Sequence, residues 1–158
     1  MSDSVNAAVR VEVSAEPAFE VFVDELASWW PREYTWSQDV LEDIGIEPHE
    51  GGLCFERGPQ GFRCDWGRVL IWDPPRRLVL GWQISPRREP EPDPAKASEV
   101  EVRFDREEGG VTRVRLEHRD FDRHGEGSAG YAQMLAAPAG WPFLLDRFSA
   151  ACAARTSC

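Results

Sequence analysis

His118 is the side chain in this sequence whose type and position best suit chemistry. It continues the apolar alternation of Val114 and Leu116, so we expect it on the buried face of a strand. An unperturbed imidazole titrates at about pH 6.5, which suits a general base or a pH switch. The alternative is a neutral, hydrogen-bonded histidine at a strand end. As an acid–base pair, its expected partner is Asp65 or Glu56.

The four cysteines form no CxxC pair, so zinc-ribbon and thioredoxin-type sites are excluded. Cys54 and Cys64 lie symmetrically about Pro59 and could face each other on adjacent strands. We expect packed, reduced thiols, with a metal or redox pair as the alternative; Cys158 is expected to be exposed. No nucleophile elbow, HExxH or phosphate-binding loop occurs. The sequence therefore predicts no metal site and no cofactor.

Alternating apolar residues predict the strands that would position these side chains. The expected strands span residues 5–13, 39–47, 53–57, 62–72, 78–82, 99–104 and 113–119. Helical spacing of apolar residues predicts one or two short helices after the first strand and a long helix at about 139–154. The order of elements is typical of an α+β domain whose antiparallel sheet wraps around the last helix.

The stretch GRVLIWDPPRRLVLGW, from Gly67 to Trp82, predicts a hairpin with apolar side chains on both faces. Its two prolines end the first strand and force a turn. One face must therefore be covered by a helix or by a ligand. If there is a ligand cavity, we expect it to be lined by Phe55, Trp66, Val69, Ile71, Leu80, Trp82, Phe104, His118, Trp141 and Leu145. The alternative is that these side chains fill a closed core.

Residues 85–97 contain four prolines among alternating charges, so we expect no regular structure there. The segment is either a solvated surface loop or a mobile lid over a pocket mouth.

Composition limits the remaining possibilities. The 158 residues suit a single domain over 1–158 with its core at about 9–154, and 42% apolar residues can build that core. The net charge of −10 disfavours nucleic acid and anionic membranes as partners. No apolar run is long enough to cross a bilayer, and the N-terminus lacks a secretion signal. We therefore expect a cytoplasmic protein, either monomeric or a homodimer.

Four segments in the expected order resemble a known family. They are Val13–Phe22 with Trp29-Trp30, Gly67–Trp82, Thr112–His118, and Gly140-Trp141 with Leu144–Phe148. Together they resemble the C-terminal-type domain of the activator of the heat-shock-protein-90 ATPase. That family belongs to the START-like (SRPBCC, birch-allergen-like) superfamily. The proline-rich loop, Pro138 and Pro142 depart from its usual pattern.

The resemblance implies a helix-grip fold, in which a curved seven-stranded antiparallel sheet holds a long C-terminal helix. Many relatives hold an apolar ligand between sheet and helix, and some are polyketide cyclases, lipid carriers or antibiotic-sequestering proteins. The leading expectation is therefore a protein that sequesters or carries a small apolar or aromatic molecule. One alternative is a cyclase- or hydrolase-type enzyme that uses His118. The other is a co-chaperone or stress-response interaction protein.

Overall fold

Seven strands form one antiparallel sheet in the order β1-β7-β6-β5-β4-β3-β2 in the computed structural model, which describes residues 4–156. The strands are β1 (Val5–Val11), β2 (Asp43–Ile46), β3 (Leu53–Arg57), β4 (Arg63–Asp73), β5 (Arg77–Trp82), β6 (Ser98–Arg106) and β7 (Thr112–Arg119). The α-helices are α1 (Ala15–Asp24), α2 (Leu26–Trp29), α3 (Ser128–Ala136) and α4 (Trp141–Thr156). Short 3-10 turns are η1 (Arg32–Tyr34), η2 (Gln38–Val40), η3 (Pro59–Gly61), η4 (Pro94–Lys96), η5 (Glu108–Gly110) and η6 (Phe121–His124).

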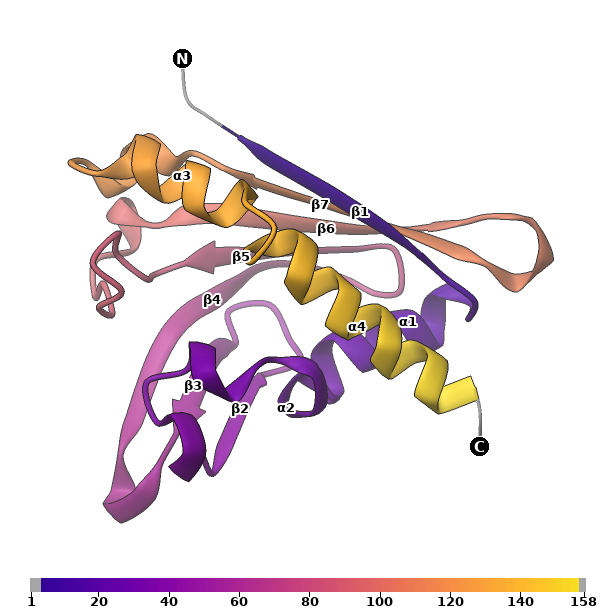
Figure 1. The fold of residues 1–158 in the computed structure, drawn as a ribbon, viewed down its shortest axis with the longest axis horizontal. Coiled ribbons are helices and arrows are strands. Elements are labelled where there is room, and N and C mark those ends of the chain that lie inside the picture. The colour runs from indigo at the N-terminus through magenta and orange to yellow at the C-terminus, as the bar shows by residue number, and fades with distance from the viewer. Residues whose placement is uncertain (1–3, 157–158) are drawn as a thin grey trace.

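The sheet curls, and α4 runs diagonally across its inner side, with α1 and α2 closing one end and α3 the other (Figure 1). This arrangement confirms the predicted helix-grip fold and the pair of short helices after the first strand. The last helix begins two residues later than predicted, at Trp141, which leaves Pro142 in the first turn where no amide hydrogen is needed.

The predicted apolar stripe of α4 makes aromatic contacts with α1 and α2, and α1 in turn contacts the sheet. Phe148 is fully buried, and its ring lies 5.4 Å from Phe22 of α1 and 5.5 Å from Trp29 of α2. Phe22 in turn meets Phe104 of β6 at 5.9 Å. Burial of each such ring stabilises the fold by about 1.5–3 kcal/mol. The end of the sheet near α1 is therefore a filled core.

Strand register assigns each side chain to one face of the sheet. One inner row crosses five strands through Val69, Leu80, Val100, His118 and Val5. The neighbouring outer row is made of Ile71, Val79, Glu101, Glu117 and Asn6. Because side chains alternate between faces, inner rows are apolar while much of the outer face is charged.

Two β-bulges in β4 correct the predicted faces. Cys54 pairs with Gly67 while Phe55 pairs with Asp65, so Trp66 is an extra residue. Leu70 is a second extra residue, between the pairs Val69–Leu80 and Ile71–Val79.

Each extra residue shifts the alternation by one position. Phe55 and Ile71 consequently lie on the outer face, and the prediction that they share the inner face is wrong. Phe55 lies instead under the guanidinium groups of Arg57 and Arg63, at 5.4 and 5.1 Å from its ring centre.

Three further differences concern local structure. The second strand, Asp43–Ile46, is shorter than predicted. Cys64 pairs with Glu56 rather than with Cys54, so the two thiols are not opposite each other. The proline-rich loop holds some local order, with the turn η4 and an isolated bridge between Ile84 and Pro90.

Within residues 4–156, the helices are all too short or too polar to cross a bilayer.

Candidate functional site

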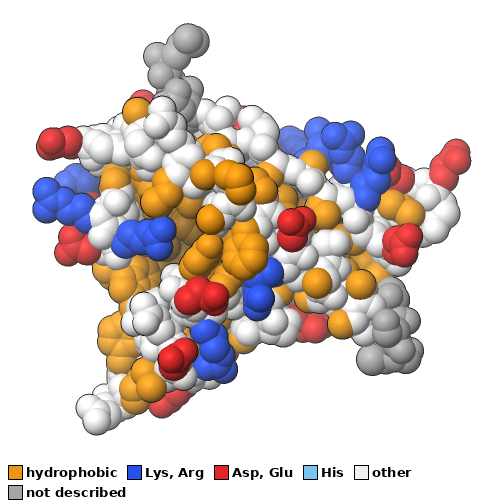
Figure 2. Space-filling model, in the orientation of Figure 1, with side chains coloured by type: hydrophobic (Ala, Val, Ile, Leu, Met, Phe, Trp, Pro, Cys, Tyr) orange, Lys and Arg blue, Asp and Glu red, His pale blue; other side chains and the backbone are white. Residues whose placement is uncertain are grey.

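A cavity of about 370 Å³ opens at the end of the sheet away from α1, between the inner sheet face, α3 and the η1–η2 segment. Its walls are mostly apolar, and Figure 2 shows hydrophobic side chains gathered around a hollow in this region. The lining residues are Trp30, Glu33, Tyr34, Thr35, Trp36, Gln38, Ile44, Glu56, Trp66, Trp82, Ile84, Arg88, Tyr131, Met134, Leu135, Ala139, Gly140 and Leu144.

Three indole rings form the aromatic wall of the cavity. Trp30 stacks on Trp66, with ring centres 6.2 Å apart and an interplanar angle of 21°. Trp82 meets Trp66 edge-on at 5.7 Å and lies 6.3 Å from Trp30. Such rings present flat, polarisable surfaces on which another planar ring can stack.

Side-chain hydrogen bonds tie the mouth of the cavity together. The Trp82 indole N–H donates to the Tyr131 hydroxyl at 2.7 Å, and that hydroxyl donates to the Ile84 carbonyl at 3.0 Å. The Trp36 indole N–H donates to the Arg88 carbonyl at 2.8 Å. Burial raises the pKa of Tyr131 to about 12, although the bond from Trp82 acts in the opposite direction. Tyr131 is therefore a neutral anchor between α3, β5 and the start of the proline-rich loop.

Glu56 is a carboxylate with no exposed surface, yet it lines the cavity. Its two oxygens accept hydrogen bonds from the backbone N–H groups of Trp36 and Ser37, at 3.1 and 2.8 Å. These bonds offset part of the cost of burying the group and fix its position. The site therefore holds one well-placed acceptor that can bind a hydroxyl group or take a proton.

His118 belongs to a different hydrogen-bond chain and does not line the cavity. Trp141 donates its indole N–H to Nδ1 at 3.0 Å, so Nε2 carries the proton and donates to Ser98 Oγ at 2.7 Å. Ser98 then donates its own proton to His124 Nε2, also at 2.7 Å.

Burial, and next the nearby His124, hold the pKa of His118 well below its ordinary value. Trp141 and Ser98 occupy the two ring nitrogens of His118, so neither Asp65 nor Glu56 is its partner. Asp65 lies on the outer face, where Arg63 binds it at 2.9 Å.

The predicted cavity residues fall into three groups. Trp66 and Trp82 line the cavity. Val69, Leu80, Phe104, His118, Trp141 and Leu145 are buried on the inner side but do not line it. Phe55 and Ile71 lie on the outer face. Trp30, Trp36 and Tyr131 also line the cavity, and the sequence did not predict them because they come from a helix end, a turn and helix α3 rather than from alternating strands.

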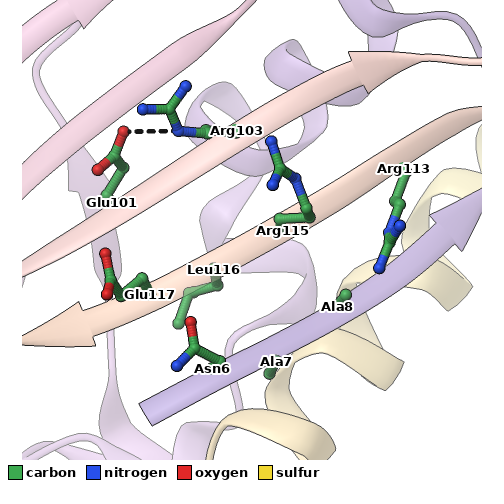
Figure 3. A pocket seen from close by; sticks show the side chains of 9 residues that line it. All are labelled: Asn6, Ala7, Ala8, Glu101, Arg103, Arg113, Arg115, Leu116 and Glu117. Atoms are coloured by element: carbon green, nitrogen blue, oxygen red, sulfur yellow. Dashed lines mark ion pairs between the residues drawn. The ribbon is translucent and has the colours of Figure 1, made fainter. Parts of the chain in front are cut away.

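A second hollow, of about 420 Å³, lies on the outer face of β1, β6 and β7. Its side chains are largely charged, as Figure 3 shows for Glu101, Arg103, Arg113, Arg115 and Glu117. Such a charged, solvent-facing groove cannot enclose an apolar molecule, so the aromatic cavity is the better candidate for ligand binding.

Glu101 is the centre of the charges on that outer face. Arg77, Arg103 and Arg119 surround its carboxylate at 2.5–2.9 Å. Burial alone would raise the pKa of Glu101, but hydrogen bonds from Arg119 and Arg77 lower it below its ordinary value. The arrangement is a structural ion-pair network across β5, β6 and β7.

The cysteines that the structure describes are free thiols at positions 54, 64 and 152, all buried. Burial, with Glu56 and Asp65 nearby, raises the pKa of Cys64 to about 11, which keeps it protonated and unreactive. Within the described residues, no group of three or more histidine, cysteine or acidic side chains is arranged to hold a metal ion. Cys158 lies outside the described residues.

The chain is similar to several solved structures along nearly its whole length. An anthrahydroquino-γ-pyrone synthase, Txn09, is 36% identical, with 94% of this chain and 96% of that chain covered and a TM-score of 0.67. CalC, a self-sacrificing resistance protein from Micromonospora echinospora, is 27% identical, with 96% and 95% covered and a TM-score of 0.68. A Staphylococcus aureus protein of unknown function, SA2116, is 16% identical (99% and 98% covered, TM-score 0.64) and shares the fold.

None of the curated proteins matches the chain. A family model described as Activator of Hsp90 ATPase homolog 1-like protein matches residues 12–153. That match spans the first helix, all strands from β2 to β7 and most of α4, and it confirms the resemblance found in the sequence. The chain therefore belongs to the family of Activator of Hsp90 ATPase homolog 1-like proteins.

Proposed function

We propose that this protein binds a planar aromatic small molecule in the cavity between the sheet and its C-terminal helices. The observation that carries the proposal is the cavity itself, about 370 Å³ in volume and walled by Trp30, Trp66 and Trp82. Ligand pockets commonly measure about 300–1,000 Å³ and combine apolar walls with a few polar groups. The similarity to an anthrahydroquino-γ-pyrone synthase, whose name contains a fused aromatic ring system, supports a ligand of this class.

Blocking the cavity mouth tests the proposal. Ala139 is exposed and lines the cavity, and its carbonyl accepts a hydrogen bond from the Tyr34 hydroxyl at 2.8 Å. Ala139→Trp should fill the mouth without disturbing that bond. Ala136→Trp is the matched control, because Ala136 is also exposed nearby on α3 but does not line the cavity.

The binding assay is quenching of tryptophan fluorescence by anthraquinone, flavone and fluorenone. We expect saturable quenching by at least one compound in the native protein and in Ala136→Trp, and at least about tenfold weaker binding in Ala139→Trp. Circular dichroism checks that both variants fold. If no compound binds, or if Ala139→Trp binds as tightly as the native protein, the proposal fails.

A second candidate function is proton transfer on the bound molecule. It is favoured by Glu56, a buried carboxylate in the cavity wall, and by the 36% identity to a synthase. Glu56 could take a proton from the carbon next to a ligand carbonyl and return one to it. The test is deuterium uptake by 4-chromanone in heavy water, followed by NMR. The native protein should accelerate uptake over buffer, and Glu56→Gln should not; equal rates in protein and buffer would exclude this role.

The co-chaperone and stress-response roles stay predictions drawn from the family resemblance alone.

A further inference from the structure

Trp66 lines the cavity, and its indole nitrogen is a buried hydrogen-bond donor without a partner. Trp66 is 3% exposed, and within residues 4–156 its Nε1 is the only buried side-chain nitrogen or oxygen without a partner. Buried indoles elsewhere in the protein do have acceptors: Trp29 donates to the Val21 carbonyl at 3.1 Å, and Trp141 donates to His118. An unpaired buried donor destabilises the folded state, so this one requires an explanation.

The backbone gives Trp66 a special position. It is the extra residue of a β-bulge, between the pairs Cys54–Gly67 and Phe55–Asp65. Bulges are frequent next to binding sites because they change the direction of a side chain. On the other side of β4, the Trp66 carbonyl accepts the Gln83 N–H at 2.9 Å, which fixes the backbone. The bulge therefore fixes the point at which the Trp66 side chain leaves β4.

Two other polar groups of the cavity, Glu56 and Tyr131, cannot take the place of Trp66. An ionised Glu56 carboxylate is negatively charged and repels a ligand carbonyl oxygen. Glu56 lies on β3 opposite Cys64, and Cys64 precedes Trp66 by two residues on β4. The Tyr131 hydroxyl already accepts from Trp82 and donates to Ile84. A carbonyl oxygen inside the cavity therefore has a donor at Trp66 and repulsion at Glu56.

We propose that Trp66 donates a hydrogen bond to a carbonyl oxygen of the ligand, which makes the ligand a planar aromatic ketone or quinone rather than a plain aromatic hydrocarbon. This inference rests on the proposed binding function and adds the ligand's chemical class and orientation. Arg88 supplies a second source of donors at the mouth, where its guanidinium contacts the Met134 sulfur at 3.5 Å. Substituting Trp66 and Arg88 one at a time shows which of the two donors binds the carbonyl oxygen.

The probes are 9-fluorenone and fluorene, which are both planar and differ by one carbonyl. The native protein should bind fluorenone about tenfold more tightly than fluorene, because the buried N–H gains a partner. Trp66→Phe should remove this preference by weakening fluorenone binding. Trp30→Phe is the matched control, since it trims the stacked neighbour and should leave the preference intact; Arg88→Gln should also leave it intact.

Infrared spectroscopy gives a second readout that a change in shape alone would not produce. A hydrogen bond lowers the carbonyl stretching frequency of bound fluorenone, and this shift should be absent in Trp66→Phe. The frequency in the native protein is informative even if that variant fails to fold. An unshifted carbonyl band in the native complex would overturn the inference.

The two proposals fail in different ways. If neither probe binds, the proposed binding function is wrong. If both bind equally to the native protein, or if the preference survives in Trp66→Phe, the cavity binds aromatic molecules but Trp66 does not select a carbonyl. Loss of the preference in Arg88→Gln alone would assign the selection to the mouth and overturn the role of Trp66.

Discussion

Lowering the pH from 7.5 to 5.5 should destabilise the protein through His118. Native His118 accepts the Trp141 N–H at Nδ1, so a proton at Nδ1 would face another N–H group across 3.0 Å. Burial first, and then nearby His124, hold its pKa well below the ordinary 6.5. The folded state therefore stays neutral here, while the unfolded chain takes up a proton as the pH falls through about 6.5.

The sign and size of the effect follow from proton linkage. Because the pKa of His118 is lower in the folded state, the contribution of neutral His118 to the free energy of unfolding is present in full above pH 6.5. This contribution is lost as the pH falls towards the pKa of His118 in the folded state. With native His118 neutral at pH 5.5, the loss is about 1.4 kcal/mol between the two pH values. Burial also lowers the pKa of His124, although nearby Glu91 acts in the opposite direction. The lowered pKa of His124 therefore adds to the loss of stability with the same sign.

Urea unfolding followed by tryptophan fluorescence measures this loss. His118→Asn keeps an acceptor near Trp141 but removes the titrating group, so its free energy of unfolding should fall about 1.4 kcal/mol less than that of the native protein over this pH range. His49→Asn changes an exposed histidine and leaves the buried chain intact, so it should show the native loss. Equal losses in the native protein and His118→Asn would refute the reasoning.

Four other variants test the core, the cavity mouth and the outer face. Phe148→Ala, at a fully buried ring, should lower the free energy of unfolding by about 3–5 kcal/mol, whereas Leu70→Ala on the outer face should cost under about 1 kcal/mol; urea titration compares them. Tyr131→Phe leaves the Trp82 N–H without its acceptor and should cost about 1–3 kcal/mol, measured by thermal unfolding. Glu101→Gln should lower the free energy of unfolding by about 2 kcal/mol at pH 7 and by less at pH 3. Because its pKa is lowered, the carboxylate stabilises the fold fully above about pH 4.5 and loses that contribution in acid. A similar cost at both pH values would contradict this.

The sequence predicted the fold well because the fold depends on patterns that are local. Alternation in β6 and β7 placed Val102, Phe104, Leu116 and His118 on the inner face, and the structure agrees. Helical spacing found α4, whose Phe148 faces the core. These periodicities report burial directly, and no long-range information is needed to read them.

The site was harder to predict because its residues depend on irregular features. The two bulges of β4 reverse the expected faces of Phe55 and Ile71, and no residue type marks a bulge reliably. The partner of His118 is Ser98, which is 20 residues away and has no motif. A useful signal for the cavity was the abundance of tryptophan outside the strands, as at Trp30.

The bulge at Leu70 divides β4 into two stretches that can change independently. On one side, Trp66 lines the cavity; on the other, Trp72 packs at 5.1 Å against Phe19 of α1. Since the alternation restarts at the bulge, an altered pairing near Trp66 need not be carried through to Trp72. Selection can therefore change the cavity end of this strand while the other end keeps its register against α1.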